Sequence, residues 1–244
     1  HWVDVAVDGA GVQWLLDHGV VETNWTQLGV VPGIQSAMRE VLGTFEARYS
    51  GKVPGRVFFD AGYEQDAVFA VCKERRSLAL AVKGFGESQY VHPKQADRKK
   101  TPLLGGDWHL SVQKEAKVLL AVLNSDRRKH LVHRGLLAPM GTPGALTLFA
   151  PGDRMEEEER FGLAKHLTAE RRIQDFDDRR GAIYVYKKFR TSNHYLDASS
   201  YAMLGLEVVE KLAERMGGGG GGSGAGGAAG GEEGDGGEAG GSWR

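Results

Sequence analysis

The first part of the chain alternates between apolar and polar residues, and later segments carry apolar residues at helical spacing. Residues 3–7 and 12–21 alternate on either side of a Gly-Ala-Gly turn, which predicts a pair of strands. From residue 34 to residue 49, apolar residues recur every three or four positions, which predicts a helix. The expected strands are 3–7, 12–21, 56–60, 78–83, 145–149 and 182–187. The expected helices are 34–49, 64–75, 112–123, 156–166 and 195–215.

The order of these elements predicts the fold class. Two or three strands come first, and helices and strands then alternate until a closing helix, which favours an α/β domain with a mixed sheet flanked by helices on both faces. Residues 84–107 are polar and contain two prolines, so we expect a long loop there. Residues 171–176 fit neither pattern clearly.

Composition divides the chain into two parts. Residues 217–244 are almost entirely Gly, Ala, Ser and acidic residues, so we expect a disordered Gly-rich acidic tail after a folded domain at 1–216. The tail contributes four acidic residues and one arginine, a charge of −3, so the net charge of −1 leaves +2 on the folded part. Affinity for nucleic acid must therefore come from local basic patches.

The cysteine count and the hydropathy pattern limit the cellular compartments in which the protein is expected. Cys72 is the only cysteine, which rules out an internal disulfide and a multi-cysteine zinc site. No apolar run approaches the roughly 20 residues of a membrane helix, and there is no signal-peptide pattern. The chain begins without Met inside a strand pattern, so we expect a soluble intracellular fragment of a longer protein.

Three aspartates stand in positions where burial of a carboxylate is expected. Asp4 lies within an apolar strand, Asp60 follows the apolar run 57–59, and Asp197 lies in the first turn of the last helix. Buried carboxylates need a cation, and Mg²⁺ suits a small carboxylate cluster because it prefers oxygen ligands. If the three converge, they can bind ions that activate water for phosphodiester cleavage.

Each aspartate also has a purely structural interpretation. Asp4 fits a solvent-facing edge strand, Asp60 fits the start of a turn, and Asp197 fits the acidic preference of a helix N-terminus. Spacing alone leaves these alternatives open.

Five motifs in order resemble a known family. They are Asp4-Val5-Ala6-Val7-Asp8, Phe59-Asp60-Ala61-Gly62, Val82-Lys83-Gly84, Leu167-Thr168-Ala169-Glu170 and Asn193-His194-Tyr195-Leu196-Asp197 followed by Tyr201-Ala202. Together they resemble the nuclease domain of the large terminase subunit of tailed phages, in the lambda-like branch. The resemblance extends from about residue 3 to residue 212.

The chain departs from this family pattern in a few places. Ala61 stands where a glycine is commoner, and His194 stands where an acid is usual, which leaves the role of position 194 open. No Gly-x-x-x-x-Gly-Lys-Ser/Thr motif occurs, so we expect the ATPase domain of the packaging motor upstream in the parent protein.

The resemblance implies a ribonuclease H-like fold and a metal-dependent endonuclease. It implies two divalent ions, Mg²⁺ or Mn²⁺, held by Asp4, Asp60 and Asp197 as the catalytic residues, with Asp8 a lesser candidate ligand. The implied substrate is concatemeric double-stranded viral DNA, cut during genome packaging in the host cytoplasm. The capsid portal and the small terminase subunit are the implied protein partners, with no role for a membrane.

Basic residues close to the last motif are candidates for DNA contact. Lys187, Lys188 and Arg190 precede Asp197, and Lys83 ends a strand next to the second motif. Lysine and arginine along a phosphate backbone supply non-specific affinity, although a solvated charged face explains such runs equally well. A third basic patch, residues 127–134, contains His130 and His133, whose spacing suits metal ligands. No third ligand is evident nearby, so these histidines are interpreted as surface residues.

Two other functions compete with the terminase interpretation. One is another ribonuclease H-like nuclease of the resolvase or transposase type, which carboxylates alone do not distinguish. The other is a non-catalytic module that docks on DNA or on the portal, in which the carboxylates are structural.

Overall fold

The alternating N-terminal segment forms the first sheet. The computed structural model describes residues 1–49, 55–97, 99–148 and 157–217. β1 (Trp2–Val7) pairs antiparallel with β2 (Gln13–Gly19), as the pattern predicts, and β7 (Leu146–Leu148) adds parallel to β2. The chain reverses at Gly11, whose φ of +78° favours glycine.

The second sheet contains the buried apolar runs. Its order is β3 (Val57–Asp60), β4 (Ala79–Phe85), β6 (Val118–Asn124) and β5 (Trp108–Gln113). β3, β4 and β6 are mutually parallel, whereas β5 is antiparallel to β6. Parallel neighbours need a crossover connection, and α3 (Gln65–Glu74) supplies it between β3 and β4.

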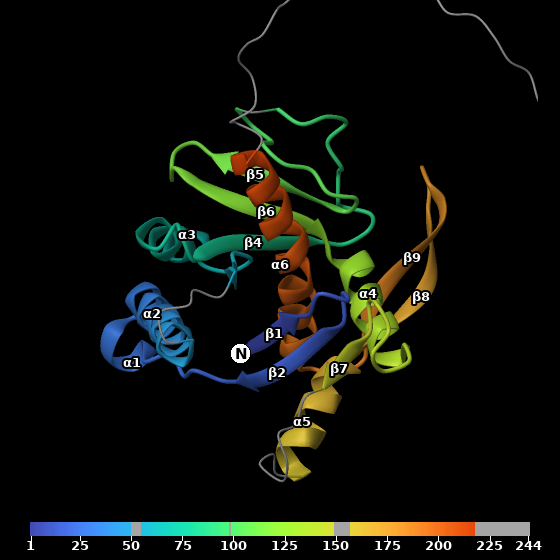
Figure 1. Cartoon of the computed structure of the whole chain (residues 1–244), viewed down its shortest axis with the longest axis horizontal. Coiled ribbons are helices and arrows are strands. Elements are labelled where there is room, and N and C mark those ends of the chain that lie inside the picture. Colours follow the sequence, from blue (N-terminus) through green and yellow to red (C-terminus); the bar gives the residue numbers. More distant parts are fainter. Residues whose placement is uncertain (50–54, 98, 149–156, 218–244) are drawn as a thin grey trace, which may run out of the picture.

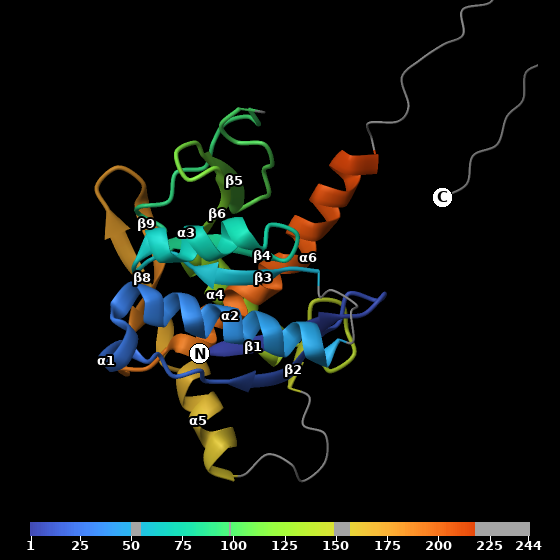
Figure 2. The ribbon, with the colours of Figure 1, turned by 90° about the vertical axis from the view of Figure 1, so that its left-hand side faces the viewer.

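α3 covers one face of this sheet, and α2 (Val30–Arg48) packs against α3. α2, preceded by the short α1 (Trp25–Leu28), lies alongside α3 (Figure 2). Met38 and Leu42 of α2 pack with Val68 and Val71 of α3 against the sheet residue Ala81. These are the apolar positions of the two predicted helices, so their helical spacing is confirmed.

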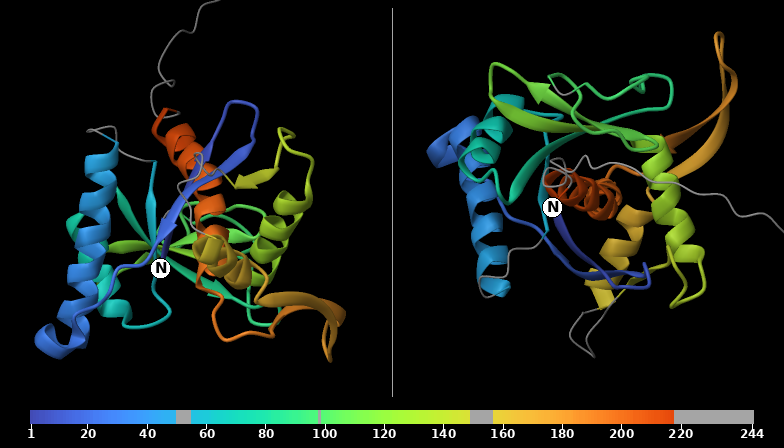
Figure 3. Two further views of the ribbon diagram at one scale, coloured as in Figure 1. Left: turned by 90° about the horizontal axis from the view of Figure 1, so that it is seen from below. Right: turned by 45° about the horizontal axis from the view of Figure 1, so that its top comes forward.

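The C-terminal helix connects the two sheets. α6 (His194–Gly217) contacts β1 and β3 and packs along α4 (Ser125–Leu137). Figure 3 shows α6 running between the strands of the first sheet and those of the second. The chain from α4 passes through β7 and α5 (Glu157–Leu167) to a two-stranded hairpin, β8 (Glu170–Asp177) and β9 (Gly181–Lys188), which projects from the body in Figure 1.

This arrangement is a mixed α/β fold with sheets flanked by helices, consistent with a ribonuclease H-like fold. It differs from the expected single mixed sheet because β1 and β3 do not pair. Large side chains stand between the two strands: the rings of Trp2 and Phe45 meet edge to face with centroids 5.5 Å apart, and both line a cavity with Phe58. Within the described residues, no helix has the length and apolar content needed to cross a membrane.

The predicted helix at residues 112–123 is wrong. The segment contains the end of β5, a tight turn and β6, and Lys117 in the turn has a φ of +57°. Residues 118–123 are almost continuously apolar, so periodicity did not separate a buried strand from a helix. Residues 171–176, which fitted neither pattern, belong to β8. The expected tail lies outside the described residues except for Gly217, which ends α6.

A buried arginine holds α4 and α6 together. Arg128 is 2% exposed and donates to Glu207 at 2.7 Å and to Asp107, and Glu207 also accepts from Trp108 Nε1 at 2.7 Å. A buried ion pair that loses one partner leaves an uncompensated charge. Arg128 therefore fixes the helix pair on which the candidate site is built.

Arg128→Met should destabilise the protein by roughly 3–5 kcal/mol, because Asp107 and Glu207 would lose their cation. Urea unfolding followed by circular dichroism measures the change. The control is Arg39→Met, which removes the exposed Arg39–Glu74 pair and should cost less than about 1 kcal/mol. Equal losses in the two variants would contradict the assignment.

Candidate functional site

Asp60 stands at the carboxyl end of β3. The ladder with β4 continues one residue further, where Ala61 N donates to Val82 O at 2.7 Å. The Asp60 Oδ1 atom then accepts from Gly62 N at 2.9 Å, so the expected turn is present. A Cβ atom on Gly62 would lie 3.2 Å from Oδ1, which makes glycine the best fit beside this carboxylate.

Asp197 is presented by the first turn of α6. Its backbone N–H donates to Asn193 O at 3.1 Å, and its Oδ2 accepts from Asn193 Nδ2 at 2.7 Å. The other oxygen, Oδ1, lies 2.8 Å from Lys129 Nζ. The Asn-x-x-x-Asp motif therefore works as one unit, in which Asn193 orients Asp197.

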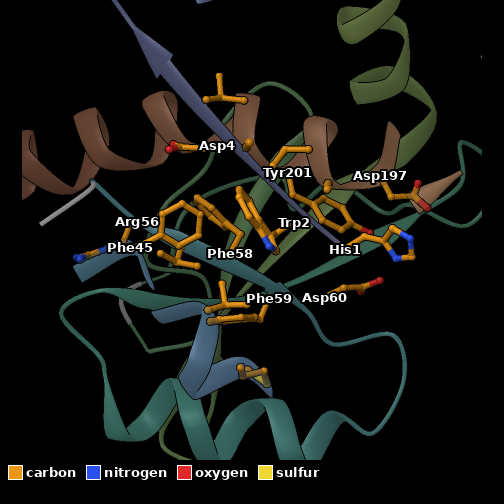
Figure 4. A pocket seen from close by; sticks show the side chains of 18 of the residues that line it. His1, Trp2, Asp4, Phe45, Arg56, Phe58, Phe59, Asp60, Asp197 and Tyr201 are labelled. Atoms are coloured by element: carbon orange, nitrogen blue, oxygen red, sulfur yellow. The ribbon is translucent and has the colours of Figure 1, made fainter. Parts of the chain in front are cut away.

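Asp60 and Asp197 lie near one another at one end of the cavity between β1 and β3 (Figure 4). The pKa of the Asp60 carboxyl is raised, first by the protein atoms that crowd around it and then by the Asp197 charge. The Gly62 N–H and the ammonium groups of Lys83 and Lys129 oppose that rise without cancelling it. A further cation close to Asp60 would relieve this unfavourable charge.

The cavity itself is largely apolar. Its volume is about 650 Å³, and β1, α2, β3 and α6 line it. Figure 4 shows the rings of Trp2, Phe45 and Phe58 in its interior and the two carboxylates at one end. Low-polarity walls strengthen the electrostatic interactions at that end.

A buried ionic cluster holds the Asp197 carboxylate in place. The ammonium of Lys129, on α4, lies 2.8 Å from both carboxylate oxygens of Glu170, the first residue of β8. Asn193 Nδ2 also donates to Glu170 Oε1 at 2.5 Å, and Lys188 donates to Asn193 Oδ1 at 2.9 Å. Burial lowers the pKa of Lys129, but the Asp197 and Glu170 carboxylates more than offset this and raise it, so the lysine stays charged.

Lys129 and Glu170 were not expected from the sequence as site residues. Lys129 falls in the basic run 127–134, to which no site residue was assigned, and it is only 8% exposed. Its position on the inner side of α4 depends on packing against α6. Glu170 gave a weak signal, because it ends one of the five family motifs.

Asp4 lines the same cavity as Asp60 and Asp197 but, contrary to expectation, its carboxylate does not join theirs. The Asp4 carboxylate accepts from Arg48 Nη1 at 3.2 Å and from the Tyr49 hydroxyl, and in Figure 4 it points away from Asp60 and Asp197. The register of β1 with β2 places Asp4 opposite Asp17, and Arg48 donates to Asp17 as well, at 2.6 Å. Asp4 is therefore neutralised locally by the end of α2.

Asp8 serves the turn between β1 and β2. Its carboxylate accepts from Ala10 N at 2.9 Å and from Val12 N at 3.0 Å, and the Val12 bond is the largest cause of its lowered pKa. Trp14 Nε1 is a third donor, at 3.3 Å. These contacts explain Asp8 without an ion.

Two carboxylates at the cavity end are the candidate ligands for a divalent ion. Asp60 and Asp197 offer carboxylate oxygens, and Mg²⁺ in proteins is commonly bound by one or two carboxylates together with water. Across the described residues, no group of three or more acidic, histidine or cysteine side chains is arranged to hold an ion. The geometry therefore differs from the three-aspartate site expected from the sequence.

The candidate DNA-contacting residues fall into two groups. Lys188 points into the ionic cluster through Asn193, and Lys83 acts electrostatically on Asp60. Lys187 pairs with Asp175 across the hairpin at 3.3 Å, and Arg190 donates to Thr168 Oγ1 at 3.3 Å. The first group faces the carboxylates, and the second is exposed on and beside the hairpin.

The hairpin also carries exposed aromatic residues next to arginines. The Arg172 guanidinium lies 3.9 Å from the centre of the Tyr184 ring, and the Arg171 guanidinium lies 5.3 Å from that of Phe189. Phe176, near the tip, is 72% exposed. This mixture of planar and cationic side chains suits a nucleic-acid surface.

Comparison with known proteins identifies one family. The family model described as terminase large subunit gpA, endonuclease domain, matches residues 2–215. Neither the curated proteins nor the solved structures gave a significant match. The match confirms the resemblance drawn from the five motifs.

Asp60→Asn should raise the melting temperature in metal-free buffer at pH 7. The folded state raises the Asp60 pKa, so this group favours folding at acidic pH, and that contribution is lost as the pH rises through its folded pKa. Asparagine removes the charge and keeps an acceptor for Gly62 N. The difference from wild type should shrink towards pH 4, as measured by differential scanning fluorimetry with EDTA.

The matched control is Asp97→Asn. Asp97 also accepts a hydrogen bond from a backbone N–H two residues on, Lys99 N at 2.8 Å, and is exposed like Asp60, but it does not line the cavity that Asp60 shares with Asp197. It should show no such stabilisation. A fall in melting temperature for Asp60→Asn at neutral pH would contradict the electrostatic description of the site.

Proposed function

Because the chain belongs to the family of terminase large subunit gpA endonuclease domains, we propose that it is a divalent-metal-dependent endonuclease whose ion is held by Asp60 and Asp197. The family has a nuclease role in phage DNA packaging, with DNA as the substrate. The finer proposal is that the chain cuts concatemeric double-stranded DNA when packaging starts and ends. Mg²⁺ or Mn²⁺ is the proposed cofactor.

The observation that carries this proposal is the electrostatic coupling of two carboxylates at the end of an apolar cavity. Asp60 is exposed at the cavity end, yet its pKa is raised, first by desolvation from the surrounding protein atoms and then by the Asp197 charge. A carboxylate perturbed in this way beside a second carboxylate favours a functional site over a purely structural turn, because a structural carboxylate is normally neutralised by a partner. Asp4 is an example of the latter, since Arg48 and Tyr49 satisfy it.

A bound divalent ion would supply a water nucleophile at neutral pH and stabilise charge on the phosphate oxygens. The protein's own residues have simpler tasks. Asp60 and Asp197 bind the ion, Asn193 and Lys129 orient Asp197, and the apolar walls of the cavity keep the charges in a poorly screened environment.

The hairpin is the proposed DNA-contacting element. It begins at Glu170 and ends at Lys188, both members of the ionic cluster, so a duplex along β8 and β9 would lead to the carboxylates. Lys187 and Arg190 are the proposed phosphate contacts on its surface. Lys188 and Lys83 are proposed to meet the phosphate nearest the ion, because they already face the carboxylates.

The remaining expectations stay proposals. The parent protein is proposed to carry the ATPase upstream, and the assembled motor is proposed to contact the capsid portal and the small terminase subunit in the host cytoplasm. A resolvase-like nuclease shares the same carboxylate chemistry, so the sequence preceding His1 in the parent protein distinguishes the two.

Asp60→Asn should reduce plasmid cleavage in Mn²⁺ to the level seen with EDTA, because it removes ligand charge at almost constant shape. Duplex binding should persist, since the substitution removes a negative charge near the phosphates. Cleavage is followed on supercoiled plasmid and binding by filter retention. Asp97→Asn should cleave like wild type, whereas full activity in Asp60→Asn would leave a DNA-docking module as the better function.

Arg190→Ala should weaken binding to all duplex sequences alike. One lost phosphate contact should reduce the slope of log K against log salt by about 0.9. Arg76→Ala, an exposed arginine after α3, is the control and should leave the slope unchanged. Equal slopes for Arg190→Ala and wild type would exclude Arg190 from the interface.

A further inference from the structure

A buried, fully paired ammonium group lies beside the proposed ion site. Lys129 Nζ is 2.8 Å from Glu170 Oε1, 2.8 Å from Glu170 Oε2 and 2.8 Å from Asp197 Oδ1. The lysine and the glutamate are almost completely buried. A buried ammonium is costly unless it is paired, and here three carboxylate oxygens surround it.

We propose that Lys129 is a positioning residue that acts as the built-in second cation of this nuclease centre, so that the centre takes a single divalent ion, on the Asp60 side of Asp197. This inference rests on the proposed metal-dependent cleavage. It replaces the two ions that the family resemblance implies with one ion and one fixed ammonium.

The contacts of Glu170 leave no need for an ion. Its Oε1 atom accepts from Lys129 and from Asn193, and its Oε2 atom accepts from Lys129. With 5% of its surface exposed, it has almost no access to solvent or to a hydrated ion. Glu170 therefore serves as the counter-charge of Lys129.

Asp197 stands between the fixed cation and the open end of the cavity. Lys129 binds its Oδ1 atom and Asn193 binds its Oδ2 atom, yet 30% of its side chain is exposed. A carboxylate has about four acceptor positions, so two remain for an ion and its water. We propose that these two free acceptor positions of Asp197 bind the ion on the side of Asp60, whose carboxylate adds negative charge there.

The charges of the cluster also argue against a second ion. Asp60, Asp197 and Glu170 carry negative charge, but Lys129 contacts two of them and Lys188 and Lys83 lie close by. A second divalent ion would therefore add positive charge that no further carboxylate of the cluster offsets. Asp4 supplies no further ligand, because Arg48 and Tyr49 hold it away.

The test counts bound Mn²⁺ by electron paramagnetic resonance of the free ion during titration of the whole chain. Wild type should bind one Mn²⁺ per chain, and Asp60→Asn should lose it. Lys129→Ala should bind two, because removing the ammonium leaves Glu170 and Asp197 as a vacant pair of ligands. Lys129→Arg should remain at one, and Lys129→Ala combined with Glu170→Gln should return to one.

Two Mn²⁺ bound by wild type, or one bound by a folded Lys129→Ala protein, would overturn the inference. If Lys129→Ala does not fold, as circular dichroism would show, Glu170→Gln in the wild-type background decides. Glu170→Gln should leave the Mn²⁺ count at one, since Glu170 is not a ligand, and loss of the ion in that variant would equally overturn the inference.

Plasmid cleavage, measured on the same samples, separates this inference from the proposed function. If wild type cleaves plasmid and binds two ions, the nuclease assignment is kept and Lys129 is rejected as the second cation. One bound ion in wild type and two in Lys129→Ala, without any cleavage, would keep the role of Lys129 and reject the nuclease assignment.

Discussion

The buried contact between Lys129 and the carboxylates of Glu170 and Asp197 is the interaction on which the rest of the site depends. It joins α4, the start of the β8–β9 hairpin and the first turn of α6, three elements that lie far apart in the sequence. Since a buried ammonium must keep its partners, these elements are fixed relative to one another. The hairpin that is proposed to contact DNA is thereby anchored to the carboxylate that is proposed to bind the ion.

The second sheet contributes Asp60 to this site. Asp60 arrives at the end of β3, with a glycine two residues on and no cation bonded to it within the described part of the chain. α6 packs against β3 and so sets the separation between Asp60 and Asp197. Asp197 is therefore held in place by its protein partners. Asp60 has no such cation, so a cation from solution can bind beside it.

Local patterns predicted the parts of this structure that depend on local interactions. The positions of Asp60 at a strand end and of Asp197 at a helix start were predicted correctly because both boundaries are visible in the sequence, and the fold class followed from the order of elements. Lys129 was missed because its burial depends on α6, more than 60 residues later in the chain. The same limit explains residues 112–123, where a buried strand and a helix share one apolar pattern, and Asp4, whose partners lie more than 40 residues away on α2.

The different roles of the aspartates follow from the positive partner that the fold places next to each carboxylate. Asp4 takes Arg48, and Asp8 takes the N–H groups of its own turn. Asp197 takes Lys129 and keeps part of its surface open. Among the described residues, the Asp60 carboxylate accepts a hydrogen bond from Gly62 N, and its pKa is raised first by desolvation and then by the second negative charge beside it. The aspartate whose neutralisation is least complete is the one where a cation from solution gains most by binding. The proposed ion site therefore lies at this end of the cavity, whereas Asp4 stabilises the contact of α2 with the first sheet.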